Sequence, residues 1–161
     1  MALVTADCGI DFYAGPSEIV IVTTRGRADW IAADLIAQAE HDPDARAVLI
    51  TPSAALAERV VRAVRAQLPS SGPARAALTA HGGIIVAASR AEAIALANDT
   101  EYGLAASIFT SNVKRALRGA RAIRAGTVTV NSFGEGDITT PFGGYKASGF
   151  GGRDNGIHAH D

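Results

Sequence analysis

The sequence predicts an α/β fold, a three-layer sandwich in which helices cover both faces of a mainly parallel sheet. Short apolar runs rich in Val and Ile alternate along the chain with longer segments of helical periodicity. An unbroken apolar run is typical of a strand that is covered on both faces. Parallel strands need a long crossover, usually a helix, so this alternation favours a parallel sheet. The 161 residues fit a single domain, 1–161, that can bury a core without disulfides.

The first half of the chain contains three predicted strands and three predicted helices. The first strand includes Ile19 to Val22 with no polar interruption. The helix after it is rich in Ala, Leu and Ile, has Asp29 near its N-terminus and is expected to bury Trp30. Ser53 is expected to cap the second helix, which ends before Pro69. The predicted elements are strands at 18–23, 47–51 and 84–87 and helices at 28–40, 54–68 and 73–81.

The second half repeats the alternation before its composition changes. Ser89 and Glu92 form a capping box for a helix at 90–98, and Ser111 is expected to cap another helix that reaches residue 124. Gly126 is expected to end that helix. Strands are predicted at 105–110 and 127–131. From residue 132 onward the chain is rich in glycine and shows no helical period, so 132–161 is predicted to be a loop and tail.

Composition excludes several classes of partner. The formal net charge of −1 shows no basic excess, so neither a nucleic acid nor an anionic membrane is an expected partner. We see neither a signal peptide nor a membrane-spanning segment in the sequence. Cys8 is the sole cysteine, which excludes an internal disulfide. A cytoplasmic location is therefore the default expectation.

One pair of side chains could bind a metal ion. Gln38 and His41 are three residues apart near the end of the first predicted helix, so they leave it on one face. Imidazole is a good zinc ligand and an amide oxygen is a weaker one. The carboxylate of Glu40 or Asp42 could hydrogen-bond to these ligands and orient them. In the alternative interpretation His41 and Asp42, followed by Pro43, form the polar end of a helix.

Longer sequence motifs around Gln38 and His41 indicate a family. The chain reads GIDFYAGPSEIVIV, then ADWIAADLIAQAEHDP, then AVLITPS. Over about residues 1–98 it closely resembles the histidinol dehydrogenases, zinc enzymes that oxidise an amino alcohol through an aldehyde to a carboxylate with NAD. The resemblance implies that Gln38 and His41 are zinc ligands and that Ser17 contacts a small-molecule substrate.

The second half resembles a different family. It reads EAIALANDTEYGLAASIFTS, then RAGTVTVNSF, then PFGGYKASGFG. From about residue 92 to 161 these words closely resemble the aldehyde dehydrogenases, especially forms that act on amino-aldehydes. The resemblance implies that Phe142 lines the aldehyde pocket and that Asn131 to Phe133 lie near the substrate tunnel. We therefore expect a chimera of two related folds, with a histidinol dehydrogenase-like segment at 1–98 and an aldehyde dehydrogenase-like segment at 99–131 before the tail.

Both resemblances are incomplete at the residues that carry chemistry. Histidinol dehydrogenases place a Pro-Glu-His proton-shuttling pair shortly after the position of Asn98, where this chain reads Thr100, Glu101, Tyr102 and Gly103. A zinc-binding Asp is also replaced, by Gly144, so zinc is expected to be held weakly. Aldehyde dehydrogenases need a thiolate nucleophile, and Cys8 lies too early in the chain to match its position, which falls near Phe12.

These losses lead to three hypotheses. Both families bind NAD chiefly through sequence upstream of the matched parts, so we expect poor NAD binding by this chain alone. The favoured hypothesis is a dehydrogenase-derived chimeric or truncated domain without activity of its own. The alternatives are a subunit of an NAD-dependent oxidoreductase that acts on an amino alcohol or aldehyde, and a zinc- or small-ligand-binding module. Homo-oligomer formation through exposed apolar surface stays open.

Overall fold

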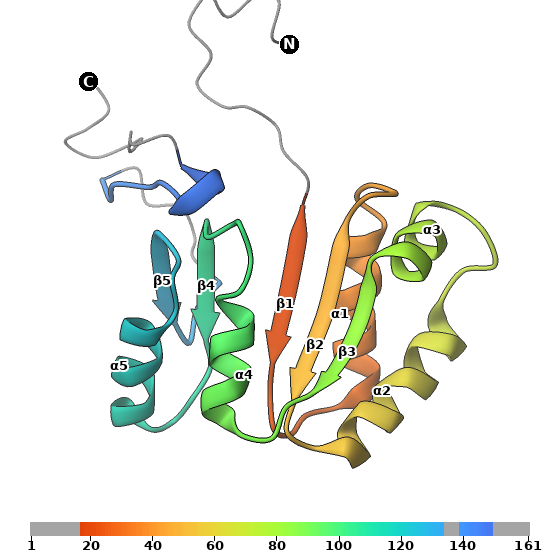
Figure 1. The fold of residues 1–161 in the computed structure, drawn as a ribbon, viewed down its shortest axis with the longest axis horizontal. Coiled ribbons are helices and arrows are strands. Elements are labelled where there is room, and N and C mark those ends of the chain that lie inside the picture. Colours follow the sequence, from red (N-terminus) through yellow and green to blue (C-terminus); the bar gives the residue numbers. More distant parts are fainter. Residues whose placement is uncertain (1–16, 134–138, 150–161) are drawn as a thin grey trace, which may run out of the picture. The chain divides into compact units, whose positions relative to one another are not determined.

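A computed structural model describes residues 17–133 and 139–149 of the chain. The predicted alternation is confirmed, because strands and helices follow one another through the described residues and every strand pair is parallel (Figure 1). The chain divides into two compact units, which we call unit 1 (Met1–Val86) and unit 2 (Ala87–Asp161). Among residues 17–133 and 139–149, no helix is long and apolar enough to cross a membrane.

Unit 1 is built on a three-stranded parallel sheet in the order β1-β2-β3. Leu49 at its centre pairs with Ile21 on one side and Ile84 on the other. The third strand begins two residues before the predicted start at Ile84, because the backbones of two preceding glycines already pair with the second strand. The strands are β1 (Glu18–Val22), β2 (Arg46–Thr51) and β3 (Gly82–Val86).

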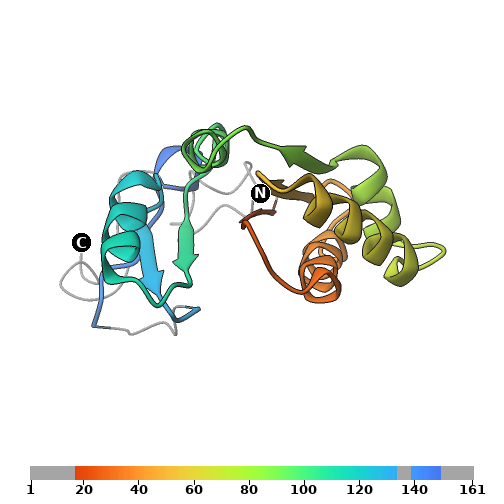
Figure 2. The same cartoon turned by 90° about the horizontal axis from the view of Figure 1, so that it is seen from below.

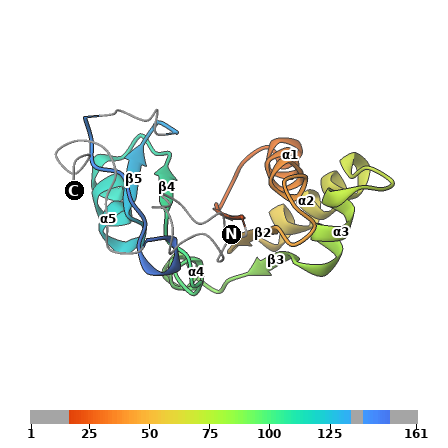
Figure 3. The same ribbon diagram turned by 90° about the horizontal axis from the view of Figure 1, so that it is seen from above.

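Three helices of unit 1 pack on one face of its sheet, as Figures 2 and 3 show. Both crossovers step in the same direction across the sheet, and right-handed crossovers of that kind place their helices on the same side. The helices are α1 (Ala28–Ala39), α2 (Ala54–Gln67) and α3 (Pro73–Ala80). The core between them and the sheet includes the buried side chains of Ile31, Leu35, Leu49, Leu56 and Val60.

Trp30 is not part of this core, and the prediction that it is buried is wrong. Its side chain is 64% exposed, because α1 turns Ile31 and Leu35 toward the sheet and Trp30 away from it. The Arg27 guanidinium lies 4.6 Å from the centroid of the Trp30 ring. Arg27 also pairs with Asp29 at 2.6 Å, and this hydrogen bond holds the pKa of the Asp29 carboxyl below its ordinary value.

Unit 2 contains a two-stranded parallel sheet with helices α4 (Arg90–Ala97) and α5 (Val113–Ala122). Its strands are β4 (Ala105–Ile108) and β5 (Thr127–Val130), and α5 forms the crossover between them. Gly119 of α5 lies against Ile108, where an added Cβ would be 3.0 Å from its Cδ1 atom. The small residue therefore lets α5 pack closely on β4.

The N-terminal caps of the helices in both units agree with the sequence-based predictions in two cases and differ in one. Ser53 Oγ accepts a hydrogen bond from the Leu56 backbone N–H in the first turn of α2 at 3.3 Å, as predicted. The capping box of α4 is also confirmed, since Ser89 Oγ accepts the Glu92 N–H at 3.1 Å and the Glu92 carboxylate accepts a backbone N–H at 2.6 Å. The prediction for Ser111 is wrong. Asn112 caps α5 instead, with its Oδ1 atom 3.0 Å from the Arg115 backbone nitrogen.

Candidate functional site

Two predicted site residues meet at the edge of the unit 1 sheet where the strands begin. Ser17 directly precedes β1, and Gln38 lies in the last turn of α1, which runs antiparallel to the strands and so returns to that edge. The Gln38 Nε2 atom donates to Ser17 Oγ at 2.5 Å, and the contact is partly buried. The Ser17 carbonyl oxygen in turn accepts from the Arg46 backbone N–H at 3.1 Å. The fold thus joins two residues that are 21 positions apart.

His41 follows Gln38 at the end of α1, but its side chain is exposed. Its backbone N–H donates to the Gln38 carbonyl oxygen at 3.2 Å. The Asp42 carboxylate accepts the Asp44 backbone N–H at 2.8 Å and so stabilises the turn into β2. Asp42 is therefore engaged in the turn, in agreement with the alternative interpretation of this segment as a polar helix end.

The residues present form only part of a zinc site. Structural zinc is bound by four protein ligands, and catalytic zinc by three and a water molecule. Gln38 and His41 supply two candidate ligands, an amide oxygen and an imidazole nitrogen. In the described part of the chain, no three His, Cys, Asp or Glu side chains gather closely enough to share an ion. The donor set of the described residues therefore does not fit zinc, and we derive no chemistry through a metal ion.

A second group of predicted residues follows the strands of unit 2. Asn131 comes directly after β5 and adopts a left-handed conformation with φ of 55°. Its side-chain amide accepts from the Thr110 N–H at 2.9 Å and donates to the Thr110 carbonyl oxygen at 3.1 Å. Asn131 therefore joins the two strand ends as one more rung of the ladder. This structural role was not predicted.

Phe133 lies on Phe109, an aromatic residue that sequence reasoning missed. Their ring centroids are 4.8 Å apart and the rings are tilted by 48°. Phe133 is 86% exposed and Phe109 is 56% exposed. Carboxyl ends of parallel strands meet at one edge of a sheet, so the position of Phe109 directly after β4 was the signal that could have found the pair.

Phe142 is half-buried and precedes a segment that we call the glycine loop (Gly143–Gly149). The Tyr145 and Ala147 backbone N–H groups donate to the carbonyl oxygens of Gly103 and Glu101 at 2.8 and 2.9 Å. Residues 134–138 and 150–161 of the predicted loop and tail lie outside the described residues, as do Cys8 and Phe12.

Lys146 adds a charged contact to the glycine loop. Its Nζ atom donates to the carbonyl oxygens of Asn98 and Thr100, both at 2.8 Å. The first of these carbonyls belongs to the C-cap of α4, where a cation is favourable. The loop therefore rests on the segment that follows α4, and it reaches that segment across more than 40 positions of sequence.

Comparison with known proteins shows both kinds of relative. The family model for histidinol dehydrogenase matches residues 1–139, which extends beyond the predicted boundary at residue 98. A histidinol dehydrogenase of Nitrobacter winogradskyi is 41% identical over 133 residues, which are 79% of this chain and 31% of that protein. An aminoacetaldehyde dehydrogenase of Pseudomonas aeruginosa is 71% identical over 70 residues, which are 44% of this chain and 14% of that protein.

The fold is confirmed by solved structures of dehydrogenases. The apo form of an indole-3-acetaldehyde dehydrogenase aligns with a TM-score of 0.55 and 31% identity, covering 91% of this chain and 34% of that one. Other solved structures of the same fold hold NAD+ or NADP. The chain spans about a third or less of the length of the two curated relatives. Since the family model covers most of its residues, the chain belongs to the histidinol dehydrogenase family.

Proposed function

We propose that this chain is a dehydrogenase-derived α/β framework, combining parts of two related dehydrogenases, that has no turnover of its own. The observation that carries the proposal is the contact between the glycine loop and the segment Thr100–Gly103. In the histidinol dehydrogenases that segment would hold the proton-shuttling pair. Here the carbonyl oxygens of Thr100, Glu101 and Gly103 instead accept hydrogen bonds from Lys146, Ala147 and Tyr145.

This contact also supports a mixed origin. The two segments that it joins belong to the sequences EAIALANDTEYGLAASIFTS and PFGGYKASGFG, which resemble aldehyde dehydrogenases. The Gly103 N–H donates to Ser148 Oγ at 3.0 Å, so this segment both donates hydrogen bonds to the glycine loop and accepts them from it. Unit 1 contributes Ser17, Gln38 and His41, which resemble the other family. By resemblance each set carries residues expected to contact substrate, and the described residues of neither set include a nucleophile hydrogen-bonded to a base.

The acid–base chemistry of Ser17 and Gln38 is consistent with this proposal. A general base must lie within hydrogen-bonding reach of the proton that it removes. Ser17 and Gln38 donate and accept hydrogen bonds, and Gln38 cannot act as a base because its amide does not ionise. These two residues can therefore bind and orient a polar group. They do not remove a proton from it.

NADH formation by the full chain tests the proposal. The purified chain is incubated with NAD+, Zn²⁺ and either histidinol or aminoacetaldehyde, and the absorbance of NADH is followed. We expect no rate above that of the protein-free mixture, with the aminoacetaldehyde dehydrogenase of Pseudomonas aeruginosa as positive control. Far-UV circular dichroism must show a cooperative unfolding transition, which establishes that the chain is folded. Steady NADH formation from either substrate above the protein-free rate would refute the proposal, and its loss in His41→Ala would assign turnover of histidinol to this chain.

A second candidate function is a zinc- or small-ligand-binding module, and the Ser17–Gln38 hydrogen bond favours its small-ligand form because it brings two polar side chains together. Zinc titration by calorimetry tests it with His41→Ala. His81→Ala is the matched control, since His81 is also at a helix end and lies 3.7 Å from the Asp44 carboxylate. A module built on Gln38 and His41 requires a loss of affinity in the first variant only. Equal affinity in all three proteins ends this alternative.

A further inference from the structure

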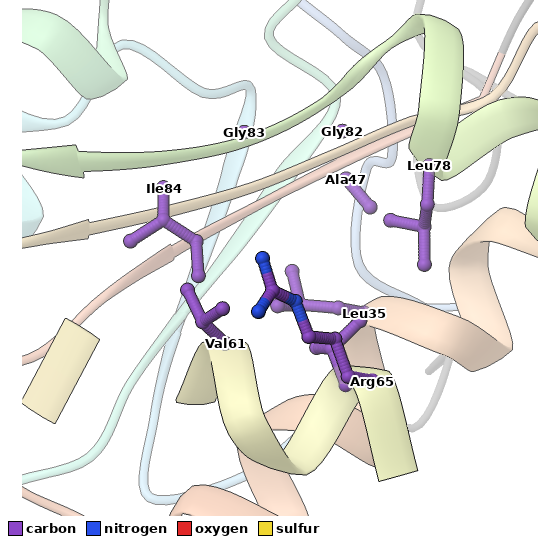
Figure 4. Close-up of a pocket in the computed structure, with 9 residues that line it drawn as sticks. Leu35, Ala47, Val61, Arg65, Leu78, Gly82, Gly83 and Ile84 are labelled. Atoms are coloured by element: carbon purple, nitrogen blue, oxygen red, sulfur yellow. The ribbon is translucent and has the colours of Figure 1, made fainter. Parts of the chain in front are cut away.

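Unit 1 contains an apolar pocket that shares no residue with Ser17, Gln38 and His41. Its volume is about 260 Å³, and it lies on the helix-covered face of the sheet (Figure 4). The lining side chains come from all three helices and from two strands. They are Leu35, Ala47, Val61, Val64, Arg65, Leu78, Gly82, Gly83 and Ile84.

The hollow exists because the smallest side chains of the sheet lie side by side. Ala47 of β2 pairs with Gly82 of β3 in the parallel register. This pair faces the helices, as does the pair Leu49 and Ile84, which lies two residues further along the strands. Neither residue of the pair has a side chain larger than a methyl group, and Leu78 of α3 lies over Gly82 at the edge of the pocket. Gly82 also permits the approach of α3, since an added Cβ would lie 2.5 Å from the Leu78 carbonyl oxygen.

Arg65 is the one charged side chain that lines the pocket. It projects from the last turn of α2, and Figure 4 shows its guanidinium extending over the pocket toward Ile84. Arg59 and Arg75 of unit 1 donate to backbone carbonyl oxygens. Arg65 forms neither a hydrogen bond nor an ion pair with any residue in the described part of the chain. No lining carboxylate competes for it.

We propose that this pocket binds a small monocarboxylate with an apolar body. The guanidinium fork of Arg65 matches a carboxylate and can bind it through two parallel N–H···O hydrogen bonds. The apolar walls formed by Val61, Val64 and Leu78 favour an alkyl or aryl group next to that carboxylate. The volume is below the range of about 300 to 1,000 Å³ of drug-sized sites, so the ligand is small. This binding goes beyond the proposed function and does not depend on turnover.

Calorimetric titration of the full chain with phenylacetate tests the proposal. We expect saturable binding that weakens with ionic strength, and at least about tenfold weaker binding of the neutral amide phenylacetamide. Arg65→Gln should lower the affinity for phenylacetate about tenfold. Arg62→Gln is the matched control, because Arg62 is an exposed residue of α2 that does not line the pocket. It should leave the affinity unchanged.

A second variant tests the apolar part of the site. Val61→Phe adds volume at the pocket wall and should reduce phenylacetate binding while Arg65 is retained. Circular dichroism of each variant shows whether it is folded. The proposal is overturned by absence of saturable phenylacetate binding to the folded chain, by equal affinity for the amide, or by unchanged affinity in folded Arg65→Gln.

Discussion

Removal of the Lys146 ammonium is expected to destabilise unit 2. In Lys146→Met the side chain keeps its approximate length but loses both hydrogen bonds to the carbonyl oxygens of Asn98 and Thr100. A bond to a charged donor contributes about 1.5–3 kcal/mol when it is shielded, and about 1 kcal/mol is appropriate here because Lys146 is exposed. The two bonds together give an expected loss of about 2 kcal/mol in the free energy of unfolding. Urea titration followed by circular dichroism measures it.

Two further variants isolate the cause of that loss. Lys114 is the other lysine of the chain and forms no hydrogen bond or ion pair with a described residue, so Lys114→Met should change stability by less than about 0.5 kcal/mol. Lys146→Gly removes the ammonium but suits the left-handed φ of 55° at this position, so it should cost less than Lys146→Met. Equal destabilisation by the two methionine variants would refute the reasoning.

Three other substitutions test contacts on which the fold depends. Asn131→Ala removes both hydrogen bonds to Thr110 and should cost about 2 kcal/mol, measured by urea unfolding. Gly126→Ala would place a methyl group against the Gly143 carbonyl oxygen, so the glycine loop must move; hydrogen exchange at the Tyr145 amide should accelerate. Ser53→Ala removes the cap of α2 and should lower the free energy of unfolding by about 1 kcal/mol.

Each of these predictions has a comparison that can contradict it. Asn131→Gly keeps the left-handed backbone while it removes the amide, so stability equal to the parent chain would show that the two hydrogen bonds contribute nothing. Unchanged exchange at Tyr145 in Gly126→Ala would show that the glycine contact does not position the loop. Ser71→Ala in the exposed loop before α3 should be neutral, and a loss equal to that of Ser53→Ala would contradict the capping account.

Most of the fold could be predicted because the signals that define it are local. The unbroken apolar run of β1 and the serine caps of α2 and α4 depend on neighbouring residues alone. The cap of α5 was misplaced by one position, because Ser111 and Asn112 are both good caps and the sequence does not show which one precedes the first helical residue. Trp30 was misassigned because its size suggested burial, whereas burial depends on which face α1 turns to the sheet.

The candidate site was less predictable because its contacts join distant segments. Helical spacing predicted that Gln38 and His41 share one face, but α1 ends at Ala39, before His41. The contact of Gln38 with Ser17 depends on the return of α1 to the start of β1. The pairing of Phe109 with Phe133 likewise requires knowledge that β4 and β5 are neighbours. The roles in substrate and metal binding were inferred from family resemblance and stay predictions. They concern Ser17, Phe133 and Phe142 for substrate and Gln38 and His41 for metal.

A single-turnover experiment tests most directly the claim that this chain is a framework without turnover. The folded chain is used in large excess over histidinol or aminoacetaldehyde, with saturating NAD+ and added Zn²⁺, so that even slow chemistry accumulates measurable NADH. Our account predicts NADH no higher than in the protein-free mixture over the full incubation. Formation of NADH in proportion to the added folded chain and to either substrate would contradict it.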